Sequence, residues 1–152
     1  MSDNDRDIAR NRKAFHEYHV LEKVEAGIAL QGSEVKSLRE GKCNLKDSYA
    51  GFENGQALLF NCHISHYGPA GLWNHVPERA RVLLLHRREI DRLFGRVQQK
   101  GLTLIPLRMY WKGGRAKVEL GLCQGKKLHD KREALKEKEL KREAQAAMSR
   151  RR

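Results

Sequence analysis

Apolar and polar residues alternate near the start of the chain. Across residues 19–25, Val20 and Val24 share one face of an extended segment, which predicts a partly buried strand. Residues 27–30 continue as a second short extended piece. Residues 1–14 are polar and show no period, so we expect a mobile leader there.

Two helices are predicted further along. Ser33 is a suitable N-cap and Gly41 a stop signal for a helix from Glu34 to about Glu40. Residues 81–86 form a compact apolar run of strand length. They lead into residues 87–100, where apolar side chains recur at helical spacing and predict the second helix.

Two hairpins are predicted at dipeptides that readily adopt positive φ, Asn54-Gly55 and Gly113-Gly114. The flanking strands are residues 48–52 with 57–60, and residues 103–111 with 116–122. Pro106 lies inside one of these strands and predicts an edge position or a bulge. Because no βαβ alternation repeats, we expect a mainly β fold over residues 15–125, a small antiparallel barrel with flanking helices.

The net charge of +12 and the pI near 9.9 point to a polyanionic partner, because cations laid against phosphates release condensed counterions. Nucleic acid is the better candidate than an anionic membrane surface, since no apolar run approaches the roughly 20 residues that span a bilayer. The first residues also lack the apolar segment of a signal peptide. We therefore expect a cytoplasmic protein with no membrane contact.

Residues 126–152 differ in composition from the rest. They hold 11 Lys and Arg against 5 Asp and Glu, so this segment carries half of the net charge of +12. Pairs such as Glu137 with Lys141 favour a helix, but the few leucines form too thin a stripe to anchor one. We expect a flexible basic tail that is disordered alone and helical on a partner. A solvated surface helix is the alternative.

No catalytic, metal or cofactor site is predicted. Cys43, Cys62 and Cys123 form no CxxC pair and are interpreted as small, reduced, buried residues. His63 and His66 lack the i, i+4 helical spacing with which two imidazoles share a zinc ion. A metal-dependent RNA-processing enzyme built on these histidines is thus a rival hypothesis only. We expect no enzymatic activity, no cofactor and no small-molecule substrate.

Basic and aromatic side chains suited to RNA gather before the first predicted strand: Arg12, Lys13, His16 and Tyr18. Aromatic rings stack on exposed bases while cations contact phosphates. Further candidates for stacking are Tyr67, Trp73, Tyr110 and Trp111, whereas Phe52, Phe60 and Phe94 are interpreted as core residues. For Tyr18, Tyr67 and Trp73, packing and stacking are equally good interpretations. Arg79 and Arg81 are candidates for cations on the barrel rim, with a solvated face as the alternative.

Five stretches resemble one known family in order and spacing. They are Asn11-Arg12-Lys13-Ala14 with His16-Glu17-Tyr18, residues 25–39, residues 44–49, Leu83-Leu84-Leu85-His86 with Glu89-Ile90, and Gly125-Lys126-Lys127 with His129-Asp130-Lys131-Arg132. The chain thereby resembles small protein B, the SsrA-binding family that partners transfer-messenger RNA (tmRNA). Val76 and Val82 depart from the pattern, standing where an Asp and a Lys are usual.

The resemblance implies an oligonucleotide-binding-type barrel and a role in trans-translation. It implies that the barrel binds the transfer-RNA-like domain of tmRNA and delivers the RNA to stalled ribosomes, with Glu25, Leu84 and His86 at the family's RNA-binding positions. It also implies a segment that reaches the small-subunit decoding centre, followed by a tail along the empty mRNA channel. That segment matches Gly125, Lys126, Lys127, His129, Asp130, Lys131 and Arg132. A generic basic oligonucleotide-binding or ribosome-associated protein is the second rival hypothesis.

Overall fold

The computed structural model of the protein describes residues 6–99, 101–126 and 136–146. Nine strands are found among them: β1 (Asp7–Arg10), β2 (Tyr18–Ile28), β3 (Cys43–Asn44), β4 (Tyr49–Glu53), β5 (Gln56–Phe60), β6 (His63–Ile64), β7 (Arg81–Leu84), β8 (Leu102–Lys112) and β9 (Arg115–Gly125). The helices are α1 (Arg12–Glu17), α2 (Gly32–Arg39), the 3-10 segment η2 (Gly68–Trp73) and α3 (Arg87–Val97). Residues 136–146 are also helical.

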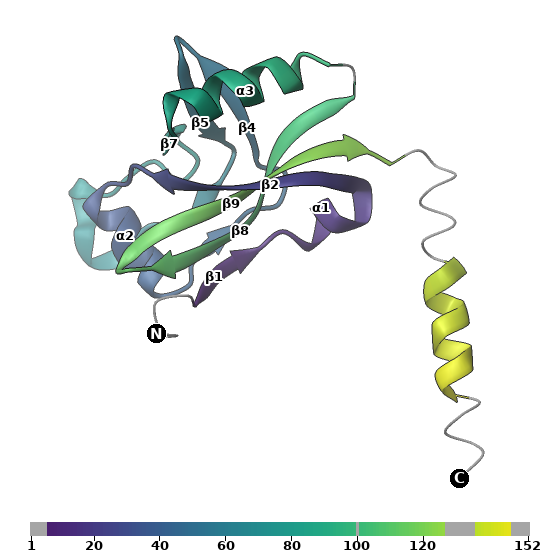
Figure 1. Ribbon diagram of the computed structural model, residues 1–152. Helices are drawn as coiled ribbons and strands as arrows, with labels where there is room; N and C mark the ends of the chain where they lie inside the picture. Colours follow the sequence, from purple (N-terminus) through teal and green to yellow (C-terminus); the bar gives the residue numbers. More distant parts are fainter. Residues whose placement is uncertain (1–5, 100, 127–135, 147–152) are drawn as a thin grey trace.

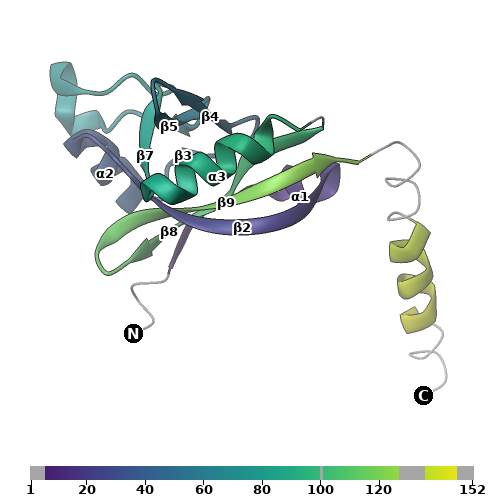
Figure 2. The same cartoon turned by 45° about the horizontal axis from the view of Figure 1, so that its top comes forward.

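Hydrogen-bonded pairing closes the main sheet into a barrel. The strand order is β1-β8-β4-β5-β7-β2-β9, and β9 pairs back onto β8. All these pairings are antiparallel. The long, strongly curved strands β2, β8 and β9 are seen side by side in Figures 1 and 2. The predicted mainly β fold with flanking helices is confirmed.

Both predicted hairpins form. Residues Asn54 and Gly55 have positive φ between β4 and β5, as do Gly113 and Gly114 between β8 and β9. The register of β8 against β9 shifts between Pro106 and Arg108. The proline therefore sits at a bulge, not at an edge, because the other side of β8 pairs with β4 and β1.

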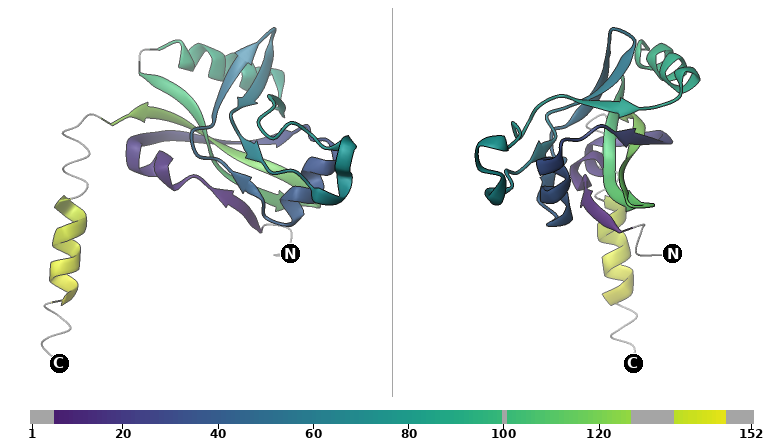
Figure 3. Two further views of the ribbon diagram at one scale, coloured as in Figure 1. Left: turned by 180° about the vertical axis from the view of Figure 1, so that it is seen from behind. Right: turned by 90° about the vertical axis from the view of Figure 1, so that its left-hand side faces the viewer.

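Apolar side chains from every barrel strand fill one core. Ala57, Leu59, Val118, Leu120 and Leu122 are all fully buried in it, and Leu93 of α3 joins them. A smaller cluster, to which Ala14 contributes from α1, lies under the other side of β8 and β9. α1 and α2 flank opposite ends of β2, as Figures 1 and 3 show.

The predicted leader is wrong for the described residues before position 15. β1 pairs with β8, and α1 begins at Arg12, because Asn11 locks this segment to the barrel. The Asn11 amide is buried; its Nδ2 donates to the carbonyls of Leu45 (3.3 Å) and Pro106 (3.0 Å), and its Oδ1 accepts from the Ala14 N–H. The polar character of this segment partly reflects a buried N-cap, and a capping residue leaves no periodic pattern of apolar positions in the sequence.

Two further boundaries differ from the prediction. β2 is one continuous strand through Ile28, since its pairing with β9 runs from Tyr18 to Gly27. α2 begins at Gly32, with Gln31 as its N-cap. Ser33, the predicted cap, instead forms a hydrogen bond between its Oγ and His75 Nδ1. The helix after β7 ends at Val97, three residues before the predicted end.

In the tail, the side chains of residues 136–145 are exposed. The helix there agrees with the predicted helical tendency of the tail. The prediction that the tail is disordered in the free chain stays a prediction.

Candidate nucleic-acid interface

A groove of about 550 Å³ brings together the three residues placed by the family resemblance. Glu25 comes from β2, Leu84 from the end of β7, and His86 from the N-cap of α3. The strand register explains why Glu25 and Leu84 lie close together, because Gly27 of β2 pairs with Leu84 and Glu25 lies two residues from Gly27 on the same face. Leu84 is 57% exposed, a large fraction for a leucine in a strand.

Lys117 also lines this groove, and the sequence analysis did not single it out. It lies on β9 directly opposite Gly27. Burial alternates along β9 so that Lys117 faces away from the core, but only the barrel's closure places it beside Glu25 and Leu84. The groove thus combines a carboxylate, an imidazole, an exposed apolar side chain and a cation.

Glu25 is held in its ionised form. The Tyr110 hydroxyl donates to Glu25 Oε2, and Lys112 Nζ lies 3.2 Å from the same oxygen. The Tyr110 hydrogen bond is the main cause that lowers the pKa of Glu25; Lys112 adds to it, and partial burial opposes both. Burial, followed by the Glu25 carboxylate, raises the pKa of Tyr110. A fixed carboxylate of this kind accepts hydrogen bonds from base amino groups or a ribose hydroxyl.

The basic and aromatic group predicted before the first strand lies elsewhere. Tyr18 begins β2, seven residues from Glu25, a distance of roughly 23 Å along a strand. None of Arg12, Lys13, His16 and Tyr18 lines the groove. Lys13 forms an exposed ion pair with Asp47 at 2.8 Å. The structure therefore separates two candidate RNA contacts that the sequence left undivided.

The beginning of the tail segment adjoins α1. Gly125 pairs with Tyr18, the Lys126 N–H donates to the Glu17 carbonyl at 2.9 Å, and Lys126 Nζ reaches the Phe15 carbonyl at 3.2 Å. The chain thus leaves the barrel beside Tyr18, at the first residue of β2, whereas Gly27 of the groove lies near the other end of the same strand. The other predicted residues of this segment lie outside the described residues: Lys127, His129, Asp130, Lys131 and Arg132.

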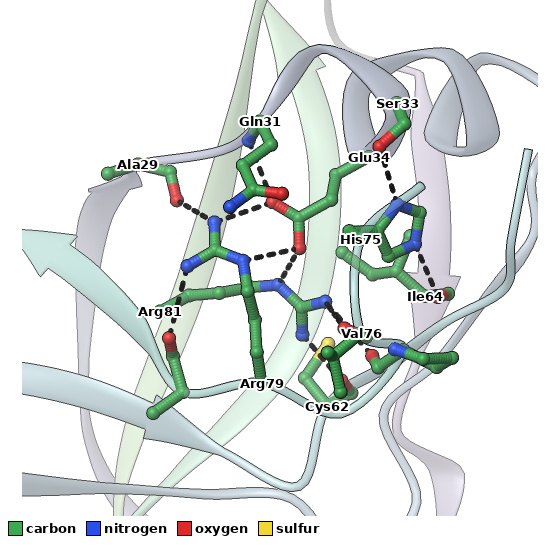
Figure 4. A network of polar contacts seen from close by, with 12 residues as sticks. Ala29, Gln31, Ser33, Glu34, Cys62, Ile64, His75, Val76, Arg79 and Arg81 are labelled. Atoms are coloured by element: carbon green, nitrogen blue, oxygen red, sulfur yellow. Dashed lines mark hydrogen bonds and ion pairs between the residues drawn. The ribbon is translucent and has the colours of Figure 1, made fainter. Parts of the chain in front are cut away.

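The prediction that Arg81 is a cation on the rim is wrong. Arg81 and Glu34 are both fully buried, and Arg81 Nε donates to Glu34 Oε2 at 2.5 Å (Figure 4). Arg79, which is 27% exposed, adds a bond from Nη2 to Glu34 Oε1 at 2.6 Å. Burial acts to raise the pKa of Glu34, but Arg79, the Gln31 N–H and Arg81 outweigh it, so that pKa is lowered. An arginine next to an apolar run gave no sign that its carboxylate partner lies 47 residues earlier.

Among the other aromatic candidates, Tyr110 is almost fully buried, with Arg108 4.0 Å from its ring centroid, so it is not available to stack on a base. Trp111 packs partly against the core. The Phe52 and Phe94 rings pack edge-on with their centroids 5.7 Å apart, although Phe94 remains half exposed.

Metal ligation finds no support in the described part of the chain, which contains no group of three or more His, Cys, Asp or Glu placed to hold an ion. His63 Nδ1 faces Glu78 at 3.3 Å, and His66 contacts His75 edge-on. The three cysteines are free. Within the described ranges, no helix has the length and apolar character needed to cross a membrane.

Comparisons with known proteins agree over most of the chain. Residues 8–150 match the family model described as SmpB protein. An SsrA-binding protein from Sulfurihydrogenibium sp. (strain YO3AOP1) is 60% identical over 136 residues, 90% of each chain. One from Carboxydothermus hydrogenoformans is 57% identical over 141 residues, 93% of this chain and 95% of the relative.

A solved structure described as "tmRNA-SmpB: a journey to the center of the bacterial ribosome" superposes with a TM-score of 0.69 at 50% identity, covering 84% of this chain and 93% of that one. The agreement of family model, relatives and fold across nearly the whole length shows that the chain belongs to the SmpB protein family.

Proposed function

We propose that this chain binds the transfer-RNA-like domain of tmRNA in the groove and delivers the RNA to stalled ribosomes, for peptide tagging and ribosome rescue by trans-translation. The observation that carries the proposal is the convergence of Glu25, Leu84 and His86 on one groove. Relatives named SsrA-binding proteins and the tmRNA-SmpB structure support this choice of RNA. The protein acts as an RNA-binding protein of the cytoplasm and not as an enzyme.

Each groove residue has a chemical role in this proposal. Glu25 accepts hydrogen bonds from base amino or ribose hydroxyl groups, and His86 hydrogen-bonds a base edge or ribose. Leu84 offers an exposed apolar contact to a base face. Lys117 supplies the positive charge that compensates phosphate next to a carboxylate.

The tail takes a separate partner, the ribosome. Residues Gly125 to Arg132 engage the small-subunit decoding centre, and the following tail lies along the empty mRNA channel. Two features support this division: the net charge is shared equally between residues 1–125 and 126–152, and the chain leaves the barrel at the end of β2 away from the groove. The start of the tail adjoins α1, since the Lys126 N–H donates to the Glu17 carbonyl and Lys126 Nζ donates to the Phe15 carbonyl.

Competition binding tests the choice of RNA. The tRNA-like domain of tmRNA and an elongator tRNA compete for the protein at matched salt, and the former should win. Glu25→Gln, Leu84→Ala and His86→Ala should each weaken binding, whereas Leu21→Ala, which removes another exposed leucine side chain outside the groove, should not. Equal affinity for both RNAs would favour the generic RNA-binding hypothesis.

Truncation after Gly125 tests the division of labour. The shortened protein should keep its affinity for the tRNA-like domain and lose peptide tagging on stalled ribosomes. Lost RNA affinity with intact tagging would refute the assignment.

A further inference from the structure

The loop between β6 and β7 exposes two large apolar side chains at its tip. Leu72 is 101% and Trp73 89% exposed, and both belong to η2. The half-exposed Phe94, by contrast, contacts a neighbouring ring. Fully exposing a tryptophan forgoes the burial that normally stabilises this side chain, so its position calls for a partner.

Hydrogen bonds fix the base of this loop. Asn74 closes the loop on Tyr67: its Oδ1 accepts from the Tyr67 N–H at 2.8 Å and its Nδ2 donates to the Tyr67 carbonyl at 2.7 Å. Gly71 turns the chain at the tip with a φ of +55°, a conformation that glycine adopts without steric cost. Buried His75 then anchors the loop between Ser33 and the Ile64 carbonyl, both at 2.8 Å (Figure 4).

Strand β7 connects this loop to the groove. Arg81 at the start of β7 donates to the Pro77 carbonyl of the loop at 2.9 Å. Leu84 of the groove lies three residues further along β7, roughly 10 Å away. The base of the loop and the groove thus share one end of the barrel, while Gly125 and the tail leave from the other end of β2.

The surroundings of the tip suit a polyanion better than an acidic or apolar protein surface. Residues 67–77 contain no Asp or Glu. Lys36 of α2 lies 5.6 Å from the Tyr67 ring centroid at the base of the loop. Aromatic side chains in a loop with a cation at its base, on a protein with a net charge of +12, provide the combination with which proteins stack on unpaired bases while contacting backbone phosphates.

We propose that Trp73, supported by Leu72, forms a second RNA contact that stacks on an unpaired base of the RNA held in the groove. This inference rests on the proposed function, since the RNA is the same. Trp73 sets the orientation of the RNA on the barrel by fixing it at a point outside the groove.

Affinity for the tRNA-like domain of tmRNA provides the first test. Trp73→Ala should raise Kd on the order of 10-fold, while Trp73→Phe, which keeps an aromatic face, should restore most of the affinity. Leu21→Ala serves as the matched control. The thermal midpoint should be unchanged in both Trp73 variants, because the exposed Trp73 side chain contributes nothing to the core.

Fluorescence provides the second test, in full-length Trp111→Phe protein, where Trp73 is the one remaining indole. Stacking on a base should quench its emission when the tRNA-like RNA is added. Unchanged affinity in Trp73→Ala together with unquenched emission would overturn the inference, and so would a blue shift that appears only with ribosomal proteins. If Leu84→Ala still weakens binding in that case, the proposed function stands although the second contact is refuted.

Discussion

Replacing Glu34 by glutamine should strongly destabilise the barrel. Both carboxylate oxygens are occupied in the native protein: Oε1 accepts from Arg79 Nη2 and from the Gln31 N–H, and Oε2 accepts from Nε of Arg79 and of Arg81. A glutamine offers one oxygen and one NH₂ group. Whichever way the amide turns, a donor faces a donor, and the buried Arg81 loses its counter-charge.

The size of the effect follows from burial. Removing one partner of a buried ion pair costs about 3–5 kcal/mol, because the remaining charge stays desolvated. Arg81 is fully buried and keeps only backbone partners, the carbonyls of Cys62, Val76 and Pro77. A small domain is stable by only about 5–15 kcal/mol, so the variant should lose a large share of its stability. Its thermal midpoint should fall by roughly 10–20 °C.

Urea unfolding followed by circular dichroism measures this loss, with Glu40→Gln as the control. Glu40 pairs with Lys42 at 3.2 Å on the surface, and an exposed pair of this kind is worth about 0–1 kcal/mol. If Glu34→Gln costs no more than Glu40→Gln, the buried network does not stabilise the fold as argued.

The same network predicts an acid dependence. The folded-state pKa of Glu34 lies below its ordinary value of 4.5, so its contribution is complete above that pH and is lost as pH falls through the folded value. The free energy of unfolding should therefore decrease on acidification below about 4.5, and decrease less steeply in Glu34→Gln. Parallel pH profiles for the two proteins would contradict this assignment.

Three further changes test the groove and the packing. Tyr110→Phe removes the hydroxyl that holds Glu25, so the pKa of Glu25 should rise toward 4.5 and RNA affinity should drop; an unchanged carboxyl titration by NMR would contradict this. Gly121→Ala should cost about 1–3 kcal/mol, since its new Cβ would lie 2.8 Å from Leu107 Cδ1, and chemical denaturation measures the loss. Gly95→Ala in α3, where nothing lies within 4 Å, should instead stabilise by about 0.5–1 kcal/mol, and a loss of stability there would show that α3 is not simply exposed at this point.

Local patterns were sufficient for much of the fold. The Asn54-Gly55 and Gly113-Gly114 turns depend on backbone conformations that particular residues favour, so neighbouring residues alone predict them. Pro106 restricted its position to an edge strand or a bulge, and the pairing of β8 with β4 and β1 decided for the bulge. The helical spacing of apolar residues predicted the helix after β7. Total charge and its division between barrel and tail likewise follow from composition.

Contacts between distant segments could not be predicted in this way. Asn11 is a buried cap that bonds carbonyls 34 and 95 residues away, so a polar segment that resembled a leader is part of the barrel. Arg81 resembled a rim cation, although its partner Glu34 lies in a different element.

The candidate site divides along the same line. Motif order alone singled out Glu25, Leu84 and His86, but only closure of the barrel brought them to one groove and added Lys117. Sequence also left Trp73 open between packing and stacking, and the tertiary structure exposed it. The physical reason is common to these cases: strand and turn preferences are local free energies, whereas burial and proximity depend on which strands pair. The sequence by itself thus determined the two hairpins, the helices α2 and α3 and the charge, and the pairing of β2 with β7 and β9 decided the site.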